Sequence, residues 1–287
     1  MIEVALAHQV TEATGREIGP KSAYAVSPQQ LASYLGRRKD WTSVCLRKQG
    51  LRSDSKGRNL LVTFDDGFRD NLTEALPVLE KYACRAIVFV ATGFIDGSTY
   101  PYELELAEAL SKHATLQLPD RAAPVPIETC EARAQWYRQL RMPLKRKSHD
   151  EREAFMEKLA ARNDYTRSTM QTERFLSWDE VRELDEHPLV EIGAHSRRHV
   201  VLTEQPLRTA YREILGSKER LETVLGHDVP FFSYPYGASN FFVRRMAQWA
   251  GVRYAFTTET ARVQSLSVLN RMAIPRVDLS DPALFHD

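Results

Sequence analysis

The stretch from Leu60 to Gly67 places the tightest constraint on how this chain folds. A mostly apolar run ends at Phe64 and is followed by two adjacent carboxylates, Asp65 and Asp66, and a glycine. A short apolar run closed by glycine is typical of a buried strand that ends in a tight turn. Ionised carboxylates are rarely buried without partners. The pair therefore indicates either an ordinary Asp-Gly turn or a site in which the two carboxylates hold different partners.

Apolar runs alternate with helical patterns along much of the chain. Strands are predicted at residues 4–8, 59–64, 85–91, 189–194, 229–234, 252–257 and 273–277. Helices are predicted to start at the capping boxes Ser27–Gln30 and Ser177–Glu180, and to span 207–225 and 241–250. Strands that alternate with helices predict an α/β fold with a mainly parallel sheet.

The segment at about 100–175 has a different texture from the rest. It is highly charged between Arg133 and Arg162 and has few apolar anchors. We interpret it as a helical insertion in one larger domain that covers residues 1–287. The segment contains a small basic cluster, made of Arg141, Lys145, Arg146 and Lys147. A solvated face is the expected role of this cluster, and contact with an anionic substrate or membrane surface is the alternative.

Overall composition excludes several functional classes. The 39 Lys and Arg residues nearly balance the 38 Asp and Glu residues, so a nucleic-acid partner is not expected. The sequence contains no run of about 20 apolar residues, so no membrane-spanning helix is expected.

The N-terminus lacks the pattern of a signal peptide, which predicts a cytoplasmic location. The three cysteines, Cys45, Cys84 and Cys130, are far apart, so each is expected to fill apolar space. The sequence does not indicate an oligomeric state.

Two imidazoles follow the strand predicted at 189–194. His195 and His199 are four residues apart, and on a helical turn this spacing puts both rings on one side. Two histidines and one carboxylate are a common ligand set for a catalytic divalent metal, although two structural histidines are the alternative. The Asp pair, the His pair and Pro235–Gly237 all follow predicted strands. Active sites of parallel α/β folds form at that edge, which favours the metal site.

Three motifs together resemble those of the polysaccharide deacetylases, also called carbohydrate esterase family four or the NodB-homology domain. Thr63–Gly67 (TFDDG) resembles the first motif, His195–His199 (HSRRH) the second, and Ser233–Gly237 (SYPYG) a variant of the third. The motifs come in the family order and span about residues 60–240. The resemblance implies a single catalytic domain with the fold of a distorted (β/α) barrel of about seven parallel strands.

The resemblance also implies a role for each motif residue. Asp65 would be the general base that activates water. Asp66, His195 and His199 would bind a divalent metal ion, with zinc favoured and nickel, cobalt or iron as alternatives. The metal would polarise the acetamide carbonyl and lower the pKa of water toward about 7. The backbone N–H of Tyr236 would help to hold the tetrahedral oxyanion.

Two departures from the family pattern concern the arginine beside the general base and the histidine that acts as general acid. The usual third motif carries an arginine that steadies the catalytic aspartate, and Ser233 stands near that place. Arg276, which follows a predicted strand, is the candidate replacement, and an ordinary surface arginine is the alternative. The usual late histidine acid has no convincing match, because His286 lies one residue from the end.

The general acid is instead predicted to be His8. The N-terminal segment ALAHQV resembles that of the permuted members of the family, which include poly-N-acetylglucosamine deacetylases. In those members the acid histidine sits on the first strand. His8 would protonate the leaving amine, and an ordinary core or surface histidine is the alternative.

The predicted function is a metal-dependent hydrolase that removes N-acetyl groups from amino sugars of a bacterial surface polysaccharide or its precursor. The missing signal peptide favours a cytosolic precursor, such as a nucleotide- or lipid-linked sugar. One alternative is hydrolysis of a non-sugar C–N amide bond. Another is a degenerate glycan-binding protein, which the missing third-motif arginine suggests. Trp178 is expected to pack at a helix start, with sugar stacking as the alternative.

Overall fold

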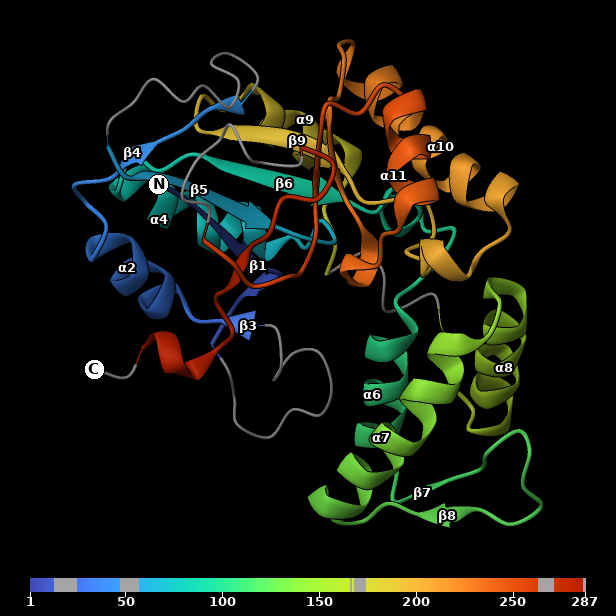
Figure 1. The fold of residues 1–287 in the computed structure, drawn as a ribbon. Coiled ribbons are helices and arrows are strands. Elements are labelled where there is room, and N and C mark those ends of the chain that lie inside the picture. The colour runs from blue at the N-terminus through green and yellow to red at the C-terminus, as the bar shows by residue number, and fades with distance from the viewer. Residues whose placement is uncertain (13–24, 47–56, 166, 168–173, 263–270, 286–287) are drawn as a thin grey trace.

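A curled sheet of parallel strands forms the body of the molecule (Figure 1). The computed structural model describes the chain except for residues 13–24, 47–56, 166, 168–173, 263–270 and 286–287. Within this part of the chain, the main strand order is β11 (Tyr254–Phe256), β10 (Phe231–Ser233), β9 (Val190–Ala194), β6 (Ala86–Val90), β5 (Asn59–Phe64), β1 (Ile2–Ala7) and β12 (Val277–Asp278). All of these neighbours pair in parallel. The predicted distorted (β/α) barrel of about seven parallel strands is confirmed.

Shorter strands add to this sheet or form small sheets of their own. β4 (Thr42–Ser43) pairs in parallel with β5. β2 (Gln9–Val10) pairs in parallel with β3 (Ala25–Val26). β7 (Thr115–Leu116) and β8 (Val125–Pro126) form an antiparallel pair.

Helices pack against one face of the sheet through a large apolar cluster. They are α2 (Pro28–Gly36), α4 (Leu76–Lys81), α9 (Trp178–Glu186), α10 (Leu207–Leu225) and α11 (Phe241–Trp249). Shorter helical segments are the π-helix η1 (Asn71–Ala75), α5 (Thr92–Ile95), and the 3-10 turns η3 (Leu202–Glu204), η4 (Pro235–Gly237) and η6 (Pro282–Leu284). Ser27 and Ser177 cap α2 and α9 through the predicted capping boxes.

Side chains of β5 alternate between two apolar clusters. Leu60, Val62 and Phe64 join the cluster that contains the helices. Leu61 joins a second cluster, built mainly from strand residues on the inner side of the sheet. Successive side chains of a strand point to opposite faces, so this alternation fixes the register of β5 against its neighbours. The chain leaves β5 at Asp65, whose side chain is buried.

The segment before β12 links the two edges of the sheet. Ile274 bridges to Phe256 of β11, whereas Val277 pairs with Ala5 of β1. The strand predicted at 273–277 is therefore misplaced, because the chain changes its pairing partner here and Pro275 has no N–H to donate. Consequently Arg276 lies ahead of β12 instead of following a strand.

The predicted helical insertion projects from the body (Figure 1). It contains α6 (Tyr102–Lys112), α7 (Cys130–Arg146), α8 (His149–Arg162) and the β7–β8 pair. A separate apolar cluster holds these elements together. Its members include Leu106, Leu144 and Leu159, which come from the three helices.

Two further expectations concern the cysteines and membrane-spanning helices. All three cysteines are free; Cys45 and Cys84 are buried as expected, but Cys130 is exposed at the start of α7, so its predicted role as filler is wrong. Over the residues described, none of the helices has the length and apolar character needed to cross a bilayer.

Candidate active site

A cavity of about 340 Å³ opens where the strands of the body end. The structure brings most of the predicted site residues together in its wall. Those that line it are His8, Asp65, Asp66, His195, His199 and Tyr236. Arg276 lies behind Asp65, to which it hydrogen-bonds. Residues from five distant segments therefore meet at the edge of the sheet that the sequence indicated.

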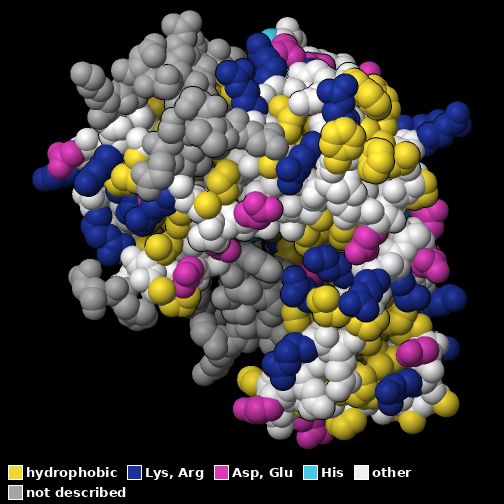
Figure 2. Space-filling view, viewed as in Figure 1, with side chains coloured by type: hydrophobic (Ala, Val, Ile, Leu, Met, Phe, Trp, Pro, Cys, Tyr) yellow, Lys and Arg dark blue, Asp and Glu magenta, His cyan; other side chains and the backbone are white. Residues whose placement is uncertain are grey.

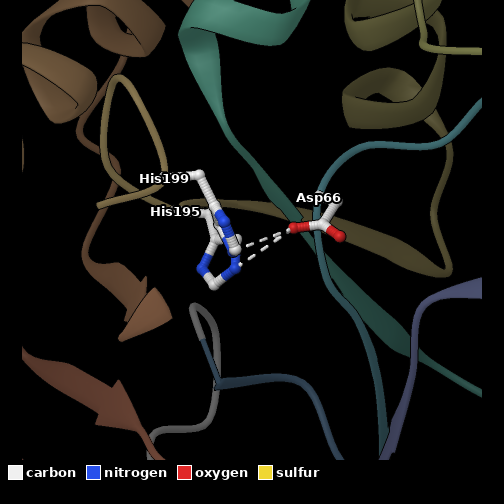
Figure 3. A group of neighbouring side chains, drawn as sticks. All are labelled: Asp66, His195 and His199. Atoms are coloured by element: carbon white, nitrogen blue, oxygen red, sulfur yellow. Dashed lines mark ion pairs between the residues drawn. The ribbon is translucent and has the colours of Figure 1, made fainter. Parts of the chain in front are cut away.

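Asp66, His195 and His199 converge on one point (Figure 3). Asp66 Oδ1 lies 3.4 Å from His195 Nε2 and 3.3 Å from His199 Nε2. One donor atom of each residue lies within 4.8 Å of the others. Among the residues described, this buried oxygen has no hydrogen-bond partner. A buried carboxylate oxygen and two imidazole nitrogens that face each other fit a divalent metal ion.

The two histidines converge although the chain between them is not helical. The segment does not form the helical turn on which that spacing would align the rings, because Ser196 (φ 60°) and His199 (φ 51°) adopt the left-handed conformation. The His199 N–H donates to Ser196 Oγ at 3.0 Å. Two further N–H groups of this loop donate to the buried Glu213 of α10, at 3.1 and 2.8 Å. These side-chain acceptors replace the hydrogen bonds of a helix and hold the loop in shape.

Hydrogen bonding, burial and the neighbouring carboxylates act differently on the two imidazoles. His195 Nδ1 lies 2.7 Å from the Ser233 carbonyl oxygen, so Nδ1 carries the proton and Nε2 presents its lone pair. Burial lowers the pKa of His199 to about 3, which keeps that ring neutral. Burial alone would also lower the pKa of His195, but the carboxylates of Asp65 and Asp66 outweigh it and raise that pKa.

Asp66 itself is held in the ionised form. Burial alone would raise its pKa, but the two imidazoles beside it lower the pKa below the ordinary value. The residue adopts φ +77°, a conformation that is uncommon outside glycine. This turn separates Asp66 from Asp65, so the adjacent carboxylates hold different partners.

Asp65 forms a buried bidentate ion pair with Arg276. The guanidinium donates from Nη1 to Oδ1 at 2.8 Å and from Nη2 to Oδ2 at 2.7 Å. Ser233 Oγ donates to Asp65 Oδ2 at 3.1 Å and accepts from Arg276 Nη2 at 2.9 Å. Arg276 is 0% exposed, so the alternative of a surface arginine is wrong. Burial would raise the pKa of Asp65, but Arg276 outweighs it and holds that pKa well below its usual range.

This shifted pKa predicts a specific pH dependence of stability. The pKa of Asp65 is lower in the folded protein than in the unfolded chain, where it is about 4. The ionised form therefore stabilises the fold above about pH 4, and this contribution is lost as pH falls toward the folded value. We expect the difference in unfolding free energy between wild type and Asp65→Asn to shrink as pH is lowered below about 4. Urea unfolding of chelated protein checks it; a difference that does not vary with pH would contradict it.

His8 lies at the end of β1, next to the carboxylate pair. The Asp65 N–H donates to the carbonyl oxygen of Ala7 at 3.0 Å, which places the two strand ends side by side. Asn71 Nδ2 in the π-helix η1 donates to the His8 carbonyl oxygen at 2.9 Å. The imidazole lines the cavity together with Asp65. His286, the other histidine considered, falls outside the described residues.

Tyr236 adopts the left-handed conformation, with φ 58° and ψ 12°. Its hydroxyl donates to Glu103 Oε1 of α6 at 2.8 Å. Its ring centroid lies 4.7 Å from that of His199. A left-handed residue other than glycine persists when its surroundings hold it, and these two contacts do so.

The insertion contributes three charged residues to the cavity wall. Glu103, Arg141 and Lys145 line it. The expected solvated face is therefore wrong for Arg141 and Lys145, which are half-buried, whereas Arg146 and Lys147 of the same cluster are exposed. A spacing of four residues on a helix would have identified Arg141 and Lys145 as neighbours.

Other supporting residues lacked any local signal. Glu213 is one acidic residue among several on α10, and only its contacts with the histidine loop distinguish it.

Trp178 packs against the main apolar cluster, and its indole N–H donates to Asp96 Oδ1 at 2.9 Å. The expected packing role of Trp178 at a helix start agrees with these contacts.

The family described as polysaccharide deacetylase matches residues 52–255. No curated protein matches the sequence significantly. The deacetylase PplD of Streptococcus pyogenes, solved with acetate, is 15% identical, with 96% of this chain and 91% of that chain covered and a TM-score of 0.62. IcaB of Ammonifex degensii is 17% identical, with 99% and 93% covered and a TM-score of 0.62.

A third solved structure has a similar fold. A de-N-acetylase of Aggregatibacter actinomycetemcomitans is 16% identical, with 96% of this chain and 94% of that chain covered and a TM-score of 0.59. At these identities the likeness establishes a shared fold. The match over residues 52–255 covers most of the chain and includes two histidines, two aspartates and Tyr236 of the cavity. The chain belongs to the polysaccharide deacetylase family.

Proposed function

We propose that the protein is a metal-dependent hydrolase that removes N-acetyl groups from amino sugars of a bacterial surface polysaccharide or its precursor. The observation that carries this proposal is the arrangement of Asp66, His195 and His199 beside an ionised Asp65 in one cavity. Membership of the family supports a hydrolase that acts on acetylated carbohydrate. The N-terminal segment that contains His8 resembles that of the permuted members of the family, which include poly-N-acetylglucosamine deacetylases.

In this proposal each residue has one task in amide hydrolysis. A divalent metal held by Asp66, His195 and His199, with zinc favoured over nickel, cobalt or iron, would polarise the acetamide carbonyl and acidify water. Asp65 takes the proton of the water whose oxygen attacks the carbonyl carbon. The Tyr236 N–H donates to the oxygen that becomes negatively charged. The C–N bond then breaks, with acetate and the free amine as products.

The alternative of a degenerate glycan-binding protein loses its motivation. That alternative depended on the missing third-motif arginine. Arg276 supplies the bidentate pair with Asp65 from a different part of the chain. An enzyme is therefore the better interpretation of the cavity.

Acetate release tests the proposal directly. Purified protein is chelated, reloaded with zinc, nickel, cobalt or iron, and assayed on N-acetylated monosaccharides, oligosaccharides, nucleotide sugars and a cyclic amide. We expect acetate from at least one amino sugar, lost on chelation and restored by one metal. Turnover of the cyclic amide alone would favour hydrolysis of non-sugar amides, and metal-loaded protein without any turnover would contradict the proposal.

The role of His8 makes a separate prediction. Replacing His8 with asparagine removes the proton donor for the leaving amine, so kcat on an N-acetylated sugar is expected to fall about a hundredfold to ten-thousandfold. An acetyl ester with a nitrophenolate leaving group needs no such proton and should lose far less. Metal content should be unchanged. Equal losses on both substrates would contradict the role of general acid.

Two broader statements remain proposals. Residues 1–287 are proposed to act as one catalytic domain, in which the insertion at about 100–175 contributes part of the cavity wall. The predicted cytoplasmic location stays a prediction, which fractionation of the native host with antibody detection would test.

A further inference from the structure

The part of the insertion that meets the body carries positive charge into the cavity. Lys and Arg side chains gather where the insertion and the body meet (Figure 2). Arg141 and Lys145, one turn apart on α7, are half-buried and line the same cavity as Asp66. Arg146, the last residue of α7, and Lys147, which follows the helix, are exposed. The fold thus places two of the four cations of the cluster in the wall of the cavity.

The Lys145 ammonium lies close to the reacting groups. Its Nζ is 4.2 Å from the centroid of the Tyr236 ring. That ring in turn lies 4.7 Å from the ring of His199. One aromatic ring therefore separates the ammonium from the candidate metal group. The cation–π contact also fixes the position of an otherwise flexible side chain.

The charges around Lys145 favour an added anion. Burial lowers the pKa of Lys145, and the neighbouring guanidinium of Arg141 lowers it further, whereas Glu103 and Glu204 act in the opposite direction. A bound anion would relieve the repulsion between the two cations. It would also offset the cost of removing the ammonium from water.

The carboxylates of the cavity leave room for such an anion. Glu103 accepts the Tyr236 hydroxyl at 2.8 Å, so one of its oxygens already has a partner, and burial raises the pKa of Glu103. Asp278 lines the cavity from β12, beside β1, and its Oδ1 accepts the Ser280 N–H at 2.9 Å. Among the described residues, neither carboxylate forms an ion pair with Lys145. The basic pair belongs to the insertion side of the cavity wall.

We infer that Arg141 and Lys145 form a binding site for a phosphate group of the substrate, attached at the anomeric carbon of the N-acetylated sugar. This inference rests on the proposed function. In a 2-acetamido sugar the anomeric carbon is bonded to the carbon that carries the acetamide, so an anomeric phosphate lies only a few bonds from the reacting carbonyl. The short path from Lys145 through Tyr236 to His199 matches that proximity. Arginine and lysine are the usual partners of phosphate oxygens.

A pair of matched substrates tests the site. N-acetylglucosamine 1-phosphate and methyl N-acetylglucosaminide differ in the anomeric phosphate. We expect the wild-type kcat/KM to be at least about tenfold higher for the phosphate, and Lys145→Gln or Arg141→Gln to lower it about tenfold to a hundredfold for this substrate alone. The control variants Arg146→Gln and Lys147→Gln alter exposed cations of the same cluster and should change neither value. Equal losses on both substrates, or no wild-type preference, would overturn the inference.

Binding measurements keep the anion site and the proposed function distinguishable. Titration calorimetry of chelated protein with N-acetylglucosamine 1-phosphate requires no turnover. If no substrate releases acetate, the proposed function fails, yet weaker binding by Lys145→Gln than by Lys147→Gln would still support the anion site. Equal binding by these two variants would overturn it.

Two classes of substrate share this phosphate chemistry. A nucleoside-diphosphate amino sugar and a polyprenyl-diphosphate amino sugar both carry the anomeric phosphate. The same assay with one substrate of each class distinguishes the sources. The class whose kcat/KM falls in Lys145→Gln and not in Lys147→Gln is the one that uses the site, and a loss in neither class would overturn the inference.

Discussion

Replacing Asp66 with alanine is expected to lower acetate release about a thousandfold or more, because the candidate metal loses its only carboxylate ligand among the described residues. The two imidazoles alone provide two nitrogen ligands and no negative charge. The protein should therefore also lose stoichiometric metal. Mass spectrometry of metal content and an acetate assay at saturating substrate measure the two effects separately.

An exposed carboxylate supplies the matched control for Asp66. The side chain of Asp179 is 94% exposed and pairs with Arg182 on the surface of α9. Asp179→Ala should keep both metal and activity. An Asp66→Ala protein that binds metal as well as wild type would refute the assignment of Asp66.

Replacing Arg276 with methionine should greatly lower the free energy of unfolding. The substitution leaves the fully buried Asp65 without its bidentate partner. Breaking a buried ion pair on one side typically costs about 3–5 kcal/mol of unfolding free energy. Urea unfolding at pH 7 measures this loss. Activity should fall as well, because burial without the guanidinium favours the protonated form of Asp65, which cannot accept a proton from water.

A double-mutant cycle separates this ion pair from a general packing effect. In an Asp65→Asn background the carboxylate charge is already absent, so Arg276→Met should cost much less. Arg182→Met breaks the exposed pair with Asp179 and should cost at most about 1 kcal/mol. If Arg276→Met cost the same in both backgrounds, the ion pair would not be the source of the stability.

Local patterns predicted the elements that carry the site. The helix predicted at 207–225 has the same bounds in the structure, because its apolar residues recur on one face of a long amphipathic segment. The strand at 59–64 likewise appears as predicted, ending at the carboxylate pair. Both signals depend only on neighbours within a few residues along the chain.

Contacts between residues far apart in the sequence could not be predicted from such local patterns. Nothing near residues 195–199 indicated that Glu213 would hold this loop in a non-helical shape. The basic cluster likewise left open whether its cations face solvent or a substrate, and which of them would do so. Such contacts depend on how distant elements pack, and local periodicity carries no information about that.

The sequence by itself therefore determined which chemical groups stand at the ends of which strands. Two carboxylates after β5 and two imidazoles after β9 follow from the residue order and the alternation of strands and helices. The tertiary structure decided which partner each group has. It brings Arg276 to Asp65 across 211 residues, because the segment before β12 links the edge strands and buries the guanidinium. It also brings Lys145 to Tyr236, because the insertion packs against the open end of the sheet, where it adds charge to the cavity wall.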